Sequence, residues 1–150
     1  MESVLSSRIR TILWGWGPVL GMMALLFVAS AQPKYEPPGG SDTVYFSGVV
    51  PVFPDGWDFL IKKSSHVLVY GLFAVLTQRA LLLHGWAVQR AAVMAVLLVV
   101  GYALTDEFHQ SFTPGRRASF LDIGFDTLGA LVAVLLVGYL LARRQQPEWE

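Results

Sequence analysis

Apolar residues along this chain form four long runs, and polar residues gather between them. Residues 11–33 contain no Asp, Glu, Lys or Arg, and most of this stretch is apolar. About 20 apolar residues in a helix cross the ~30 Å of bilayer hydrocarbon, and a helix satisfies its backbone hydrogen bonds within the span. The pattern therefore predicts an all-α protein, a single domain forming an integral membrane bundle of four transmembrane helices. We place these helices at about residues 12–30, 64–83, 88–108 and 120–141.

Composition agrees with a membrane protein and excludes other classes. The chain is 54% hydrophobic and 15% charged, whereas about a quarter of the residues in a soluble domain are charged. Aromatic residues make up 13% of the chain, which is too many for a disordered segment. The formal net charge is zero, so a nucleic-acid partner is not expected, because nucleic-acid-binding domains are basic. The absence of cysteine excludes disulfides and thiolate sites.

The first apolar run has two interpretations. Arg8 and Arg10 precede it and Ala29-Ser30-Ala31 closes it, which is the pattern of a cleaved signal peptide. The run is longer than the 7–15 residues usual for a signal-peptide core. Its Gly17-x-x-x-Gly21 spacing also permits close approach of a second helix, so we expect self-association at Gly17 and Gly21. We favour a retained helix; cleavage would leave three spans.

The longest connection between the predicted helices covers residues 31–63. Near its end, Trp57, Phe59 and Leu60 lie beside Lys62 and Lys63, which is typical of a segment at the membrane interface. We expect this loop to be extracytoplasmic, for the reason that follows.

Alternation of four antiparallel spans brings the start of the second, the end of the third and the start of the fourth to one membrane face. The other face holds six of the 11 basic residues and three of the 11 acidic ones, leaving five basic and eight acidic on the first face. By the positive-inside rule the arginine-rich face is cytoplasmic. The chain is therefore expected to be a multi-pass protein of the cell membrane with both termini cytoplasmic. The outward face collects a set of residues that we call the polar cluster: His66, Tyr70, Asp106, Glu107, His109, Gln110, Arg116, Arg117, Asp122 and Asp126.

Helical spacing places members of the polar cluster on shared faces. His66 and Tyr70 are four residues apart, as are Asp106 and Gln110, and such pairs are neighbours on a helix. Asp122, Asp126, Gly129 and Ala133 form one stripe of polar and small residues, which is expected to face other helices. Ionisable residues inside a membrane are functional candidates by default.

Structural interpretations of the same residues stay open. Ser119-x-x-Asp122 matches a capping box, so Asp122 could cap the fourth helix. Arg116 or Arg117 could form an ion pair with Asp106, Glu107 or Asp126, and His66 could be a hydrogen-bonded residue between helices. His84 and the tryptophans are expected to be structural residues or interfacial anchors.

The chemistry of the cluster suits an anionic or polar headgroup. Carboxylates with histidine can hold a hard cation such as Mg²⁺ or divide into general acid and base. Arginine offers planar donors to phosphate. Catalytic candidates are Asp106, Glu107, His109 and Asp126, and metal-ligand candidates are Asp106, Glu107, Asp122 and Asp126. Ligand-binding candidates are His66, Tyr70, Asp106, Glu107, Gln110, Arg116, Asp122 and Asp126.

The sequence resembles the VanZ-like family, small bacterial membrane proteins named after a teicoplanin-resistance accessory protein. The resemblance is carried by Asp106-Glu107-Phe108-His109-Gln110, Pro114-Gly115-Arg116, Ser119, Asp122, Thr127-Leu128-Gly129 and Lys63-x-x-His66-x-x-x-Tyr70. The chain departs from the family's pattern twice. Asp126 stands where the family usually has Asn, and Lys62 stands where it usually has an acidic residue. The resemblance implies a cell-envelope protein linked to glycopeptide susceptibility.

Two functional hypotheses follow, together with a third that the pattern disfavours. The first is a VanZ-like envelope protein that binds a lipid or glycolipid headgroup, or influences susceptibility to a glycopeptide such as teicoplanin, through the outward polar cluster. The second is a metal-assisted membrane enzyme acting on a lipid phosphate or an isoprenoid-linked envelope precursor, with Mg²⁺ as the cofactor. A transporter is disfavoured, because four short spans with one polar end offer no polar path to the other face.

Overall fold

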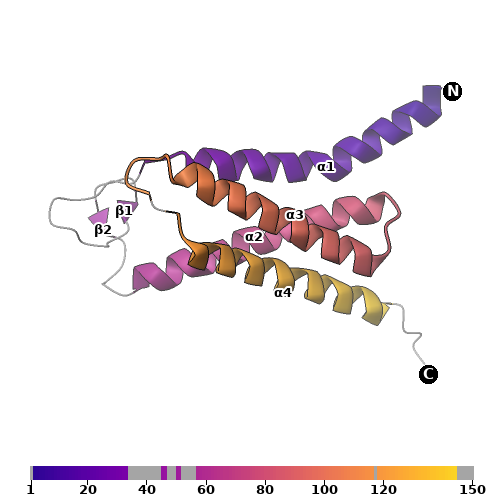
Figure 1. The fold of residues 1–150 in the computed structure, drawn as a ribbon. Coiled ribbons are helices and arrows are strands. Elements are labelled where there is room, and N and C mark those ends of the chain that lie inside the picture. Colours follow the sequence, from indigo (N-terminus) through magenta and orange to yellow (C-terminus); the bar gives the residue numbers. More distant parts are fainter. Residues whose placement is uncertain (1, 34–44, 47–49, 52–56, 117, 145–150) are drawn as a thin grey trace.

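The computed structural model describes residues 2–33, 45–46, 50–51, 57–116 and 118–144. Four helices dominate this part of the chain: α1 (Glu2–Ser30), α2 (Trp57–Leu83), α3 (Val88–Gln110) and α4 (Phe120–Arg144) (Figure 1). Each helix is long and apolar enough to cross a membrane, which confirms the prediction of a four-helix membrane bundle. Two short antiparallel strands, β1 (Tyr45–Phe46) and β2 (Val50–Pro51), lie beyond the end of the bundle.

The second helix begins at Trp57, well before the predicted residue 64. The predicted boundary followed the apolar run, which Lys62 and Lys63 interrupt. Lys63 is buried instead, because its ammonium pairs with a carboxylate of α4, so the helix continues through the two lysines. The aromatic segment forms the first turn of α2, and its position at the membrane interface stays a prediction.

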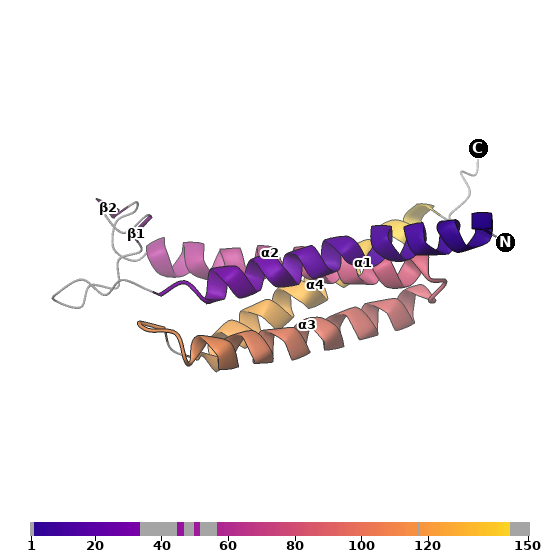
Figure 2. The same cartoon turned by 90° about the horizontal axis from the view of Figure 1, so that it is seen from above.

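Successive helices run in opposite directions (Figures 1 and 2). The end of α1, the start of α2, the end of α3 and the start of α4 lie together, and we call this the pocket end of the bundle. The opposite end, where α1 begins and α4 finishes, is called the far end. α4 packs chiefly against α2.

The contact between α2 and α4 depends on a glycine. A Cβ atom at Gly129 would overlap the backbone of Val67, and one at Gly71 would lie 3.1 Å from the Gly129 carbonyl oxygen. The two backbones approach closely only because these side chains are missing, as in other membrane helix pairs with small residues at the interface. This approach brings the polar residues of α2 next to those of α4.

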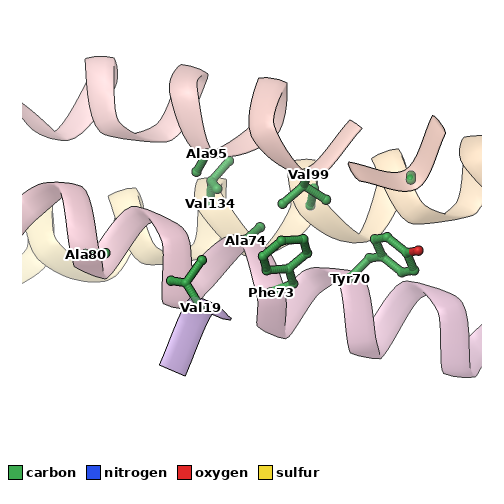
Figure 3. Packing of buried hydrophobic residues seen from close by; sticks show 10 residues of the cluster. Val19, Tyr70, Phe73, Ala74, Ala80, Ala95, Val99 and Val134 are labelled. Atoms are coloured by element: carbon green, nitrogen blue, oxygen red, sulfur yellow. The ribbon is translucent and has the colours of Figure 1, made fainter. Parts of the chain in front are cut away.

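Mostly small side chains fill the interior of the bundle. Figure 3 shows Ala74 and Phe73 of α2 facing Ala95 and Val99 of α3, with Tyr70 continuing the row towards the pocket end. Phe73 and Tyr102 pack edge to face, with ring centroids 5.4 Å apart. In a membrane, the hydrophobic effect does not drive helices together, so their association depends on close packing. Alanines at these positions permit that close packing.

A proline bends α1 and leaves one carbonyl without its helical hydrogen bond, which a side chain of α2 supplies. Pro18 lies inside α1, and the helix changes direction along its length (Figure 1). Proline has no N–H, so the carbonyl four residues earlier, that of Trp14, loses its helical partner. The Arg79 guanidinium donates to this Trp14 oxygen at 3.0 Å. Arg79 therefore replaces the hydrogen-bond donor that Pro18 removes.

Candidate functional site

An ion-paired group joins the second turn of α2 to the first turn of α4. The Lys63 ammonium contacts Asp122 Oδ1, and Lys62 Nζ lies 3.4 Å from Asp122 Oδ2. The Asp122 side chain is 4% exposed and that of Lys63 is 9% exposed. Because each lysine contacts a different oxygen of one buried carboxylate, the charge of Asp122 is compensated within the protein.

A histidine–aspartate pair lies one turn deeper. His66 Nδ1 is 2.8 Å from Asp126 Oδ1, and the Asp126 side chain is 1% exposed. His66 Nε2 lies 4.0 Å from Asp122 Oδ2, which is too far for a hydrogen bond. His66 is thus the hydrogen-bonded residue between helices that one sequence interpretation proposed.

A third group connects α2 with α3. The Tyr70 hydroxyl donates to Asp106 Oδ2 at 3.2 Å, and the Gln110 amide donates to the same oxygen at 2.8 Å. The Arg116 Nη1 group donates to Gln110 Oε1 at 3.3 Å. The helical spacing of Asp106 and Gln110 predicted their shared face correctly.

Glu107 supports the start of α4 from a neighbouring helix. Its Oε2 accepts the Ser119 N–H at 2.6 Å, while the Ser119 hydroxyl accepts the Asp122 N–H at 3.4 Å. In a capping box the acidic side chain three residues after the cap would take the N–H of the cap residue. Here the Asp122 carboxylate pairs with two lysines instead. Glu107 accepts the hydrogen bond of the Ser119 N–H in place of Asp122.

Arg116 mainly holds the end of α1. Its Nε donates to the Gln32 carbonyl and its Nη2 to the Ala29 carbonyl, each at 2.9 Å. These carbonyls lie at the C-terminal end of α1, where no further helical turn supplies donors. Among the described residues Arg116 forms no ion pair with an acidic side chain, so the suggested Arg116 ion pair is wrong. Arg117 lies outside the described residues.

His109 faces α1 and takes no part in the carboxylate groups. Its Nδ1 shares a hydrogen bond with the Ser30 hydroxyl at 3.1 Å, and its ring stacks on Phe27 with centroids 4.4 Å apart. The expectation that His109 would act beside Asp106 and Glu107 therefore finds no contact to support it. Successive residues of a helix point in different directions, so His109 faces another neighbour of α3 than Asp106 and Glu107 do.

A pocket of about 160 Å³ opens between α1, α2 and α3 at the pocket end. We call it the α1–α2–α3 pocket. Its lining comprises Leu26, Ala29, Ser30, Ser65, His66, Val69, Tyr70, Asp106, Gln110 and Arg116. Five of the eight ligand-binding candidates thus line one pocket, whereas the remaining three, Glu107, Asp122 and Asp126, do not line it.

The metal-ligand candidates are distributed among separate partners. Within the described part of the chain, no group of three or more His, Cys, Asp or Glu side chains is arranged to hold a metal ion. One carboxyl oxygen each of Asp106, Glu107 and Asp126 is buried without a partner among the described residues. Hydrogen-bond acceptors therefore remain free at this end of the bundle.

Two contributors were not recognised as site residues from the sequence. Lys63 was assigned to the outer charge balance, although its three-residue spacing from His66 places both on one helical face. Ser30 was considered only as part of a cleavage signature, yet it lines the α1–α2–α3 pocket and is 3% exposed. No sequence signal identified Ser30, because its partner is 79 residues away.

Comparison with known protein families identifies the family to which the chain belongs. The family model VanZ/LLP1 matches residues 16–142. The chain belongs to the VanZ/LLP1 family. No curated protein and no solved structure matches it. Its four spans make this VanZ-like protein a multi-pass membrane protein. The matched range contains the whole α1–α2–α3 pocket and every residue of the polar cluster.

Proposed function

We propose that this VanZ-like protein binds the polar headgroup of a membrane amphiphile, a lipid or a glycolipid, in the α1–α2–α3 pocket. The observation that carries the proposal is the mixed lining of the pocket. His66, Tyr70 and Asp106 contribute polar atoms, while Leu26 and Val69 contribute apolar wall. Pockets for small ligands combine an apolar wall with a few polar groups that fix orientation.

The position of the pocket favours an amphiphile over a freely diffusing solute. The pocket lies at the ends of spans long enough to cross a membrane. Leu25 and Val28 of α1 flank the lining residues and are 63% and 59% exposed. An amphiphile can place its headgroup in the pocket while its acyl chains lie along this apolar surface, as lipids do on other membrane proteins.

We further propose that the pocket faces outward from the cytoplasmic membrane and that both termini are cytoplasmic. Arginines concentrate at the far end, which supports a cytoplasmic location for that end. The chain has no cysteine, so single cysteines can report topology. An impermeant maleimide should label Ser111→Cys in intact cells and Gln89→Cys only after permeabilisation. The reverse labelling would overturn this orientation.

Native mass spectrometry with added phospholipids and glycolipids tests the binding itself. Ala29→Phe should fill the pocket without removing a polar group, because the Ala29 side chain is exposed into it. We expect lipid binding to weaken about tenfold or more, corresponding to ~1.4 kcal/mol. Thr11→Phe, in the cavity at the far end, is the matched control and should bind as the wild type does. Equal binding by both variants would contradict the proposal.

Glycopeptide susceptibility is the expected cellular consequence, since the family resemblance connects such proteins with teicoplanin. A deletion strain complemented with wild type, Ala29→Phe, Glu107→Gln or Arg116→Ala can be challenged with teicoplanin and vancomycin. Wild type should change susceptibility and Ala29→Phe should not. If wild type and deletion strain respond alike, this member does not influence glycopeptide action.

A further inference from the structure

We propose that the α1–α2–α3 pocket selects a headgroup that carries a hydroxyl group, and that His66 accepts the hydrogen bond of this hydroxyl through Nε2. This inference depends on the proposed function, because it names the chemical class of the ligand for the same pocket. It makes His66 the residue that determines specificity.

The Nδ1 side of the ring is fixed by Asp126. The distance from His66 Nδ1 to Asp126 Oδ1 is 2.8 Å, and an ionised carboxylate can only accept a hydrogen bond. With Asp126 ionised, as the proposal requires, the proton resides on Nδ1. The close approach of α2 and α4 at Gly129 holds the two side chains in this position.

The Nε2 side is left with its lone pair. Among the described residues no side chain lies within hydrogen-bonding distance of Nε2, and the nearest carboxylate, that of Asp122, is 4.0 Å away. Asp122 is already paired with Lys62 and Lys63. A neutral ring protonated on Nδ1 presents an acceptor at Nε2.

His66 is a lining residue whose ring is held in a defined plane. His66 lines the pocket with its side chain 18% exposed. The Tyr70 ring lies parallel to it, with an interplanar angle of 2° and centroids 6.1 Å apart. The orientation of Nε2 is thus set by contacts on both Nδ1 and the ring face.

The proton of a hydroxyl group distinguishes it from an ionised phosphate. Ionised phosphate oxygens have no proton to donate, so phosphate alone cannot satisfy Nε2. An ammonium group can also donate, and the eight acidic and five basic residues on this face do not disfavour its charge, so phosphatidylethanolamine is included in the test. A hydroxyl donates without adding charge. Glycerol and sugar headgroups both supply one, and they are separate arms of the test.

Nitrogen NMR of the histidine rings tests the acceptor directly. The chain contains three histidines, so ring-labelled protein in lipid nanodiscs gives few signals, and His66→Asn identifies that of His66. At neutral pH we expect a protonated Nδ1 and an unprotonated Nε2. A proton on Nε2, with or without one on Nδ1, would overturn the proposal.

Binding of matched lipids tests the selectivity. Phosphatidylglycerol and phosphatidylpropanol have the same charge and nearly the same size, but only the first has free hydroxyls. Wild type should prefer phosphatidylglycerol by about three- to tenfold, which is the ratio that one net hydrogen bond provides. Glucosyl diacylglycerol should be preferred over diacylglycerol if the hydroxyl comes from a sugar. A preference in either pair supports the proposal and identifies the source.

His66→Asn provides the variant arm, because its amide can still donate to Asp126 while the Nε2 acceptor is lost. The preference should disappear and phosphatidylpropanol binding should remain, which also shows that the variant folds. Phosphatidylethanolamine binding more tightly than all hydroxylated lipids would overturn the hydroxyl assignment. Equal binding of the two lipids within each matched pair would also overturn the hydroxyl assignment. If Ala29→Phe still weakened the binding of all these lipids, the proposed function would stand. Lipid binding unaffected by Ala29→Phe would remove both.

Discussion

The two ends of the bundle treat their polar side chains differently. At the pocket end, Lys63, His66 and Tyr70 of α2 pair with carboxylates of another helix. At the far end, Arg79 and His84 turn to main-chain carbonyls instead. Arg79 donates to the Trp14 carbonyl, and His84 Nδ1 lies 2.7 Å from the Ala80 carbonyl. A hydrogen bond to a main-chain carbonyl satisfies one side chain and brings no second functional group beside it. Hydrogen bonds between side chains bring several functional groups together at one place.

The larger of the two cavities lies at the far end, away from the candidate site. The far-end cavity measures about 360 Å³ and is lined by Arg10, Thr11, Trp14 and Leu83. The α1–α2–α3 pocket is smaller, at about 160 Å³, yet it holds the converging polar atoms. The comparison shows that the lining, rather than the volume, distinguishes the candidate site.

The largest expected effect comes from breaking the ion pair at the pocket end. Lys63→Met would leave the Asp122 carboxylate buried with only the more distant Lys62. Removal of one partner of a buried pair costs about 3–5 kcal/mol. We expect a loss near the lower end of this range in the free energy of unfolding, measured by titration with sodium dodecyl sulfate. Lys63→Met combined with Asp122→Leu should recover most of the stability, and a double variant no better than Lys63→Met would refute the explanation.

A smaller effect, with opposite signs at two glycines of α4, is expected from added methyl groups. Gly129→Ala would collide with the Val67 backbone, whereas a Cβ at Gly138 meets nothing within 4 Å. Overpacking costs about 1–3 kcal/mol, while alanine in place of an unpacked helical glycine stabilises by roughly 0.5–1 kcal/mol. Thermal unfolding should therefore shift down for Gly129→Ala and up for Gly138→Ala. A shift in the same direction for both would argue against close α2–α4 packing.

The smallest expected effect concerns the far end. Arg79→Ala should destabilise the protein by about 0.5–1.5 kcal/mol, because the Trp14 carbonyl loses its donor. In a Pro18→Ala background the helix supplies its own N–H to this carbonyl, so the same substitution should cost less. A double-mutant cycle measures this coupling. Identical costs in the two backgrounds would mean that Arg79 does not compensate for Pro18.

The sequence predicted the spans because hydrophobic runs of this length have few alternatives, and it predicted the meeting of α2, α3 and α4 because antiparallel alternation requires it. It did not predict which side chains pair. The capping of Ser119 by Glu107 and the turn of His109 towards Ser30 depend on the rotation of α3 about its axis. Such rotation is set by packing between helices, for which the apolar pattern of a membrane span gives weak information.

Photo-crosslinking with a lipid that carries the reactive group in its headgroup tests the central claim most directly. The lipid is incorporated into nanodiscs with the purified protein, and the linked residues are found by peptide mass spectrometry. We expect adducts on the lining of the α1–α2–α3 pocket, such as Ala29, Ser65 and Val69, and their loss in Ala29→Phe. Adducts centred on Thr11, Trp14 and Leu83 of the far-end cavity, or spread evenly over both ends, would contradict it.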